Sequence, residues 1–123
     1  MSNENPILII LDHFWQQVAG SDEYRRTQWA MSTYIQAKSF STGKATGVGL
    51  WGSGQVNWSI DFGEKFDRLD FDCQCQAMKV AGKSENTAPC NHLIRALIQM
   101  EAKLRNKTFE EIHSDRIRTV IPF

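Results

Sequence analysis

The chain has 123 residues, of which 41% are hydrophobic and 23% are charged, and its 14 basic residues balance 14 acidic ones. This length predicts one domain spanning 1–123, and the composition excludes wholesale disorder. The longest apolar run near the N-terminus covers residues 7–11, far fewer than the roughly 20 that cross a bilayer, and no basic secretory signal is recognised there. We therefore expect a cytoplasmic or nucleoid-associated protein with no membrane partner.

Two helices are expected within the first 45 residues. Asn5-Pro6 is typical of a helix N-cap followed by proline at the first helical position, and Gly20 suits the end of that helix. The apolar residues between them recur at helical spacing: Ile7, Leu8, Ile10, Leu11, Phe14, Trp15 and Val18. Ser21-Asp22 offers a second cap, and a weaker apolar stripe that runs to Ile35 predicts the second helix. Residues 1–45 are thus predicted to form a helical N-terminal region.

The periodicity changes to two residues from Thr46 onward. Apolar side chains then alternate with small or polar ones, as in half-buried strands: Val48, Leu50, Val56, Trp58, Ile60, Phe62, Leu69, Phe71 and Cys73. Glycine-containing turns at 52–54 and 63–65 separate these runs. The pattern predicts a small antiparallel β-meander or hairpin.

A loop and further helix follow the meander. Residues 76–89 have no apolar period and include Gly82 and Pro89, which predicts a loop. The next apolar stripe has helical spacing: Leu93, Ile94, Leu97, Ile98, Ala102 and Leu104. Thr108 and Glu111 have the spacing of a capping box, which predicts one more short helix. We expect an α+β fold with N-terminal helices, the small sheet, the loop and a C-terminal helix.

All three cysteines lie within 18 residues, as Cys73-x-Cys75, fourteen intervening residues and Cys90-x-His92. Structural zinc is held tetrahedrally by four sulfur or nitrogen ligands, and three thiolates with one imidazole form an accepted set. Residues i and i+2 of a strand project to one face, so the first two sulfurs can converge on one ion. Cys90 and His92 would join them from the entry to the next helix. The spacing predicts one structural Zn²⁺ that makes 76–89 a zinc-binding loop.

Other interpretations of these residues remain open. A disulfide would leave one cysteine unpaired, and Cys73 and Cys75 are poorly placed to bond each other within a strand. The cysteines could also be ordinary buried side chains beside an incidental histidine. Cys90 and His92 could form a thiol nucleophile with its base, and Asp70 and Asp72 flank the first pair as carboxylates. Four protein ligands would close a zinc site to substrate, so we expect no catalytic residues and no small-molecule substrate.

The same residues resemble the SWIM-type zinc finger, whose pattern is CxC, a variable spacer and CxH at the start of a helix. The matching strings are Cys-Gln-Cys at 73–75, Pro-Cys-Asn-His at 89–92 and Leu-Ile-Arg-Ala-Leu-Ile at 93–98. The resemblance covers roughly 46–105 as a SWIM-like zinc-finger region and leaves 106–123 as a C-terminal extension. It implies that Cys73, Cys75, Cys90 and His92 bind the metal. It also implies a recognition module, since members of this family bind DNA in some settings and proteins in others.

The segment 76–107 is basic although the whole chain is neutral. It carries six basic side chains against two acidic ones: Lys79, Lys83, Arg95, Lys103, Arg105 and Lys107. Such a cluster suits phosphate contacts, which favours nucleic acid, and DNA in particular, as the partner. The alternatives are that these are ordinary solvated charges, or that the chain is a protein interaction adaptor with a purely structural zinc. The apolar tail at 120–123 and the N-terminal helices would then dock on a protein partner.

Overall fold

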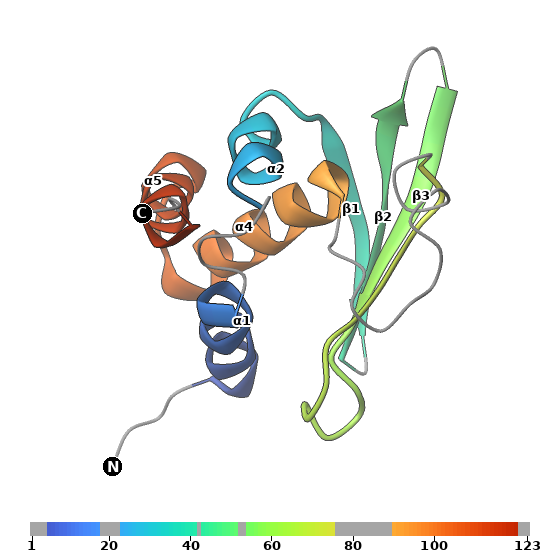
Figure 1. The fold of residues 1–123 in the computed structure, drawn as a ribbon. Helices are drawn as coiled ribbons and strands as arrows, with labels where there is room; N and C mark the ends of the chain where they lie inside the picture. The colour runs from blue at the N-terminus through green and yellow to red at the C-terminus, as the bar shows by residue number, and fades with distance from the viewer. Residues whose placement is uncertain (1–4, 18–22, 42, 52–53, 76–89, 121–123) are drawn as a thin grey trace.

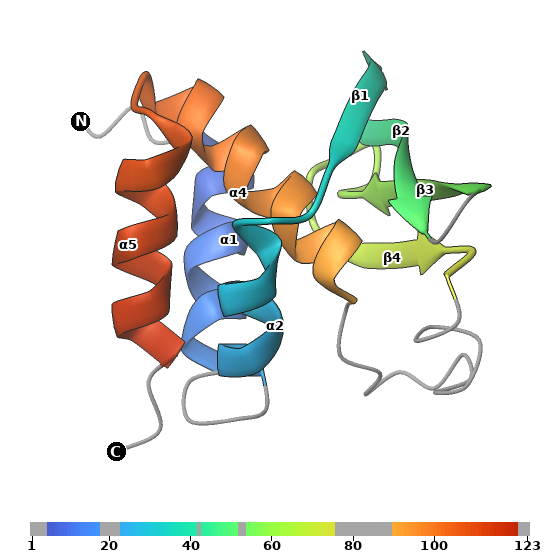
Figure 2. The same cartoon turned by 90° about the horizontal axis from the view of Figure 1, so that it is seen from above.

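The computed structural model describes residues 5–17, 23–41, 43–51, 54–75 and 90–120. In chain order the elements are α1 (Pro6–Gln17), α2 (Glu23–Ala30), β1 (Ile35–Ser41), β2 (Lys44–Trp51), β3 (Gly54–Asp61), β4 (Asp70–Cys73), α4 (Asn91–Arg105) and α5 (Phe109–Val120). The predicted α+β fold is confirmed. Helix α4 lies between the sheet on one side and α1, α2 and α5 on the other (Figure 1). The view from above shows the same order (Figure 2).

Helix α1 begins as its sequence predicts. The side-chain Oδ1 of Asn5 accepts a hydrogen bond from the backbone N–H of Ile7 at 2.9 Å, which satisfies one of the free donors of the first turn. Pro6 occupies the first helical position, where its missing N–H costs no helical hydrogen bond. The buried stripe of the helix consists of Ile7, Leu11, Phe14 and Trp15. The expected helix end at Gly20 and the second cap at 21–22 lie outside the described residues.

The four strands form one antiparallel sheet in the order β1-β2-β3-β4. The expectation of helix up to Ile35 is wrong, because α2 ends at Ala30 and Ile35 begins β1. The carbonyl oxygens at the end of α2 are satisfied from outside the helix, since Arg95 donates to the carbonyls of Ala30 at 2.9 Å and Met31 at 3.0 Å. The chain then pairs with β2, and this long-range pairing outweighs a weak helical stripe.

The core lies between the sheet and α4. The face of the sheet toward α4 carries the buried residues of β3 that the alternation predicted, including Trp58 and Ile60. Helix α4 contributes four fully buried side chains: Leu93, Ile94, Leu97 and Ile98. Burying one such side chain contributes about 1.5–3 kcal/mol, so α4 is the main apolar link between the two layers. Its last residue is followed by Asn106 in the left-handed conformation, whose N–H bonds back to the helix.

Helix α5 confirms the predicted capping box. The N–H of Glu111 donates to Thr108 Oγ1 at 3.1 Å, and the N–H of Thr108 donates to Glu111 Oε1 at 3.3 Å. Such reciprocal bonds satisfy two otherwise free donors at the helix start and contribute about 1 kcal/mol. The helix extends for 12 residues, longer than the short helix expected.

A cluster of four charged side chains joins α1, α4 and α5. Arg116 donates to Glu101 at 2.7 and 2.9 Å and to Asp12 at 2.6 Å, and Arg105 donates to the same two carboxylates. Glu101 is only 2% exposed and Arg116 8% exposed, so each charge depends on its partners for stabilisation. This cluster fixes the relative positions of the three helices at the end of α4 away from the first turn.

Within the part of the chain that the structure describes, no helix is long and apolar enough to cross a membrane.

Candidate metal centre

Regular elements position both pairs of candidate ligands. Cys73 is the last residue of β4, where it pairs with Trp58 of β3, and Cys75 lies two residues further on. Gln74 continues the pairing beyond β4, because its N–H donates to the carbonyl of Asn57 at 3.0 Å. On the other side of the centre, Cys90 is the N-cap of α4 and His92 lies in the first turn. The sheet and helix therefore meet at these four side chains.

The four ligand atoms are buried and close together. Cys73, Cys75, Cys90 and His92 are between 1% and 4% exposed, and their ligand atoms all lie within 4.8 Å of one another. His92 Nδ1 lies 3.8 Å from the sulfur of Cys90 and 4.0 Å from that of Cys73. Tetrahedral zinc, with Zn–S near 2.3 Å and Zn–N near 2.05 Å, requires sulfur–nitrogen separations of about 3.6 Å. The cluster can hold one metal ion after shifts of less than about 1 Å.

The ring of His92 is oriented by a bond on its far side. Its Nε2 lies 2.8 Å from the carbonyl oxygen of Leu50. Because a carbonyl oxygen can only accept a hydrogen bond, Nε2 must carry the proton and donate it. A neutral imidazole that donates from Nε2 presents an unprotonated Nδ1, which is the atom that faces the sulfurs. Metal-binding histidines characteristically donate their other N–H to a carbonyl or carboxylate in this way. The bond therefore prepares His92 as a ligand.

Gly49 of β2 makes room for the same ring. A Cβ at position 49 would lie 2.7 Å from His92 Cδ2 and 3.4 Å from Ile35. The neighbouring inward glycine has a different role, because a Cβ at Gly47 would lie 2.4 Å from the ring of Trp58. The alternation Gly47-x-Gly49 was available in the sequence, but nothing there indicated which rings would pack on the two glycines.

In the absence of a metal ion, burial and the contacts among the ligands set the protonation of Cys90 and His92. The contact with the Cys73 thiol and burial together raise the pKa of Cys90 to about 12. Hydrogen bonding with Cys90 and the carbonyl of Leu50 raises the pKa of His92 to about 9 despite its burial. Both groups hold protons at neutral pH, so a metal ion must displace them.

Comparison with protein-family models, with curated proteins and with solved structures gave no match. The assignment of this centre therefore depends on the chemistry and geometry of its residues.

All three cysteines are free thiols, which argues against the disulfide alternative.

The carboxylates that flank the first pair do not join the cluster. Asp70 and Asp72 are exposed, and Asp70 forms an ion pair with Arg68 at 3.3 Å. Because side chains alternate along β4, Asp72 projects to the face of the sheet opposite Cys73. Neither carboxylate is positioned to act on a group bound at the centre.

The six candidate nucleic-acid contacts differ in what they do. Arg95 bonds to the end of α2 and stacks 3.8 Å above the ring of Phe109. Arg105 belongs to the ionic cluster with Glu101 and Asp12. Two lysines of this set are exposed and lie at or beyond the last turn of α4: Lys103 and Lys107. The remaining two lie outside the described residues: Lys79 and Lys83. Both arginines of this set thus form hydrogen bonds or ion pairs with other residues of the protein.

Proposed function

We propose that this chain is a non-enzymatic recognition module whose sheet and central helix are held together by one structural zinc ion. The observation that carries the proposal is the convergence of three buried thiols and one imidazole nitrogen within 4.8 Å. Thiolate-rich sites that include imidazole favour zinc over the harder magnesium and calcium ions, which prefer oxygen. Four ligands complete a tetrahedron, which supports a structural role over a catalytic one.

We also propose that the centre is a SWIM-type finger. The arrangement that supports this is the CxC pair, Cys73 and Cys75, at the end of a strand and the CxH pair, Cys90 and His92, at the start of a helix. In this arrangement the metal would join β4 to α4, which the chain itself connects only through the long segment 76–89.

The partner that we favour is another protein. Two of the six basic side chains expected to contact phosphate are engaged in internal contacts, Arg95 with α2 and Arg105 with Glu101. These contacts reduce the charge available for a phosphate backbone. An adaptor function needs only a rigid scaffold with an exposed binding surface, and a zinc-stabilised sheet and helix would provide one.

Nucleic acid is the second candidate, and the exposure of Lys103 and Lys107 favours it. If these lysines bind phosphates, the affinity for a short DNA duplex should fall steeply as salt increases. Replacing both with alanine should then reduce the logarithmic salt slope by about 0.9 for each phosphate that is no longer neutralised. An affinity that does not respond to salt, or no binding at physiological salt, would leave the protein adaptor as the function.

The zinc proposal is tested by elemental analysis of protein purified under reducing conditions. We expect about one zinc per chain, and almost none after His92→Ala. His13→Ala is the matched control, because His13 is an exposed histidine of α1 that is not a member of the cluster. Zinc content that is equal in both variants would refute the proposal.

A further inference from the structure

The helices leave part of the inner face of the sheet, which we define as the face toward α4, uncovered. Phe40 of β1 pairs directly with Ala45 of β2, and directly paired residues project to the same face. Ala45 is 4% exposed and belongs to the core, so Phe40 also points to the inner face. Phe40 is nevertheless 52% exposed. An aromatic ring on the core side of the sheet thus remains accessible.

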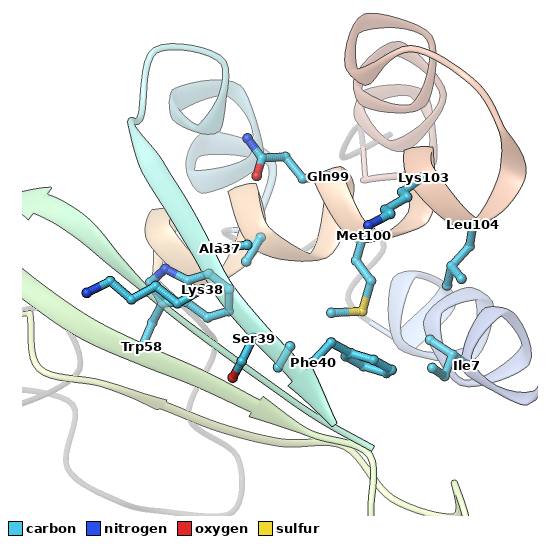
Figure 3. A pocket seen from close by; sticks show the side chains of 12 residues that line it. Ile7, Ala37, Lys38, Ser39, Phe40, Trp58, Gln99, Met100, Lys103 and Leu104 are labelled. Carbon is cyan, nitrogen blue, oxygen red and sulfur yellow. The ribbon is translucent and has the colours of Figure 1, made fainter. Parts of the chain in front are cut away.

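Phe40 forms one wall of an apolar groove between β1 and α4. The groove has a volume of about 750 Å³, within the range of ligand-binding pockets. Figure 3 shows Phe40 extending from β1 toward Met100 of α4 and Ile7 of α1. Leu104, at 37% exposure, lines the groove beside them. This space is large enough for one or two large apolar side chains.

The charge and the backbone around the groove restrict what can occupy it. Lys38 and Lys103 line it, and none of the described residues that line it is acidic. On its outer side β1 pairs with no strand among the described residues, so its backbone is an open sheet edge. The pairing with β2 shifts register between Ala37 and Ser39, and Lys38 occupies this irregularity. An extended chain with acidic and apolar side chains fits these features better than a phosphate backbone, which has no apolar anchor.

We propose that this groove binds an extended segment of a partner protein that carries large apolar side chains flanked by acidic residues. The apolar anchor packs against Phe40 and Met100, and an acidic residue pairs with Lys103. The backbone of the segment lies along the open edge of β1, as in other cases of strand addition. This inference deepens the proposed recognition function and depends on it.

The test measures fluorescence anisotropy of a labelled peptide with the full-length, zinc-loaded protein. The probe alternates leucine and phenylalanine with aspartate, and two counterparts replace either all aspartates by lysine or all apolar residues by alanine. We expect the acidic apolar peptide to bind at least ~10-fold more tightly than either counterpart, since both anchor and charge contribute.

Charge reversal on the protein provides the decisive comparison. Lys103→Glu should weaken binding of the acidic peptide ~10-fold and improve binding of the lysine counterpart. Lys65→Glu is the matched control, because Lys65 is an exposed lysine in the turn after β3 and does not line the groove. Phe40→Ser should weaken binding of the acidic peptide by a similar factor, because the apolar anchor then has no aromatic ring to pack against.

Zinc content is measured on every variant, because neither Phe40 nor Lys103 belongs to the metal cluster. Normal zinc without peptide binding would overturn the groove proposal and leave the zinc proposal intact. Equal affinity of Lys103→Glu and the unmodified protein would overturn it as well. Two further results would overturn the groove proposal. One is tight binding of a single-stranded DNA oligonucleotide that is lost in Phe40→Ser. The other is a dimer of this chain, seen by sedimentation analysis, that dissociates in Phe40→Ser.

Discussion

Gly49 and His92 lie so close that a single methyl group on Gly49 would come within 2.7 Å of the imidazole ring. The adjacent ring atom, Nε2, donates a hydrogen bond to the carbonyl of Leu50, the residue that follows Gly49 in β2. Strand β2 therefore both supports the ring and fixes its direction, although it supplies no metal ligand.

Gly49→Ala should therefore lower zinc affinity. The added Cβ pushes the ring away from the carbonyl of Leu50, and removing such an orienting hydrogen bond typically costs 10- to 100-fold in metal affinity, about the range we expect here. Competition with a chelator measures the affinity, and the absorption spectrum of the cobalt-substituted protein reports on the ligand geometry. Gly47→Ala is the comparison, because its Cβ crowds the carbonyl oxygen of Gln36 and the ring of Trp58 instead of His92. It should lower stability and keep the cobalt spectrum. Identical spectra and affinities for both variants would contradict this role of Gly49.

Zinc binding should become tighter as pH rises through neutrality. In the metal-free protein the pKa of Cys90 is raised to about 12 and that of His92 to about 9, so both carry a proton at pH 7. Zinc binds the deprotonated forms, and binding therefore releases at least the two protons that this pair carries. Calorimetric titration in two buffers of different ionisation enthalpy counts the protons. An affinity that is constant between about pH 6 and about pH 8 would contradict the expectation.

Glu101→Gln should strongly destabilise the fold. The substitution removes the buried carboxylate that both Arg105 and Arg116 contact, and breaking a buried ion pair typically costs about 3 kcal/mol or more. Urea denaturation of the zinc-loaded protein measures the free energy of unfolding. Asp12→Asn is the matched change, and because Asp12 is 48% exposed we expect a decrease of only about 1 kcal/mol. Equal decreases for the two variants would show that burial of Glu101 is not the cause.

Arg95→Met should lower stability without changing zinc content. The variant removes the hydrogen bonds that Arg95 donates to the carbonyls of Ala30 and Met31 and the charge above the ring of Phe109, for an expected decrease of about 1–3 kcal/mol. Lys107→Met makes the same kind of change at an exposed site and should have little effect. Thermal unfolding with zinc analysis compares the two. If Arg95→Met left the unfolding temperature unchanged, the arginine would be free to bind a partner.

Local patterns in the sequence predicted much of this structure. The alternation over 46–62, the stripe of α4 and the capping box of α5 each depend on residues within a few positions of one another, and each is confirmed. The convergence of Cys73 and Cys75 with Cys90 and His92 is also confirmed. The identity of the metal stays a prediction.

The features that sequence analysis missed depend on interactions between distant segments. Strand β1 forms because β2 pairs with it, and Arg95 bonds to the end of α2 from 64 and 65 residues further along the chain. The ionic cluster joins Asp12 to Arg116 across 104 residues. Charged residues on a helix have the same pattern whether they face solvent or one another, so their partners could not be inferred from spacing.

Helix α4 connects two dissimilar anchors. Its first turn carries His92, and its last turns carry Glu101 and Arg105, so about 14 to 20 Å of helix separates the metal centre from the ionic cluster. A chelator would release only the first anchor. The apolar side chains of α4 still pack against the sheet, so we expect the chelated protein to loosen first where β4 ends and α4 begins, while α1, α4 and α5 stay joined by the ionic cluster.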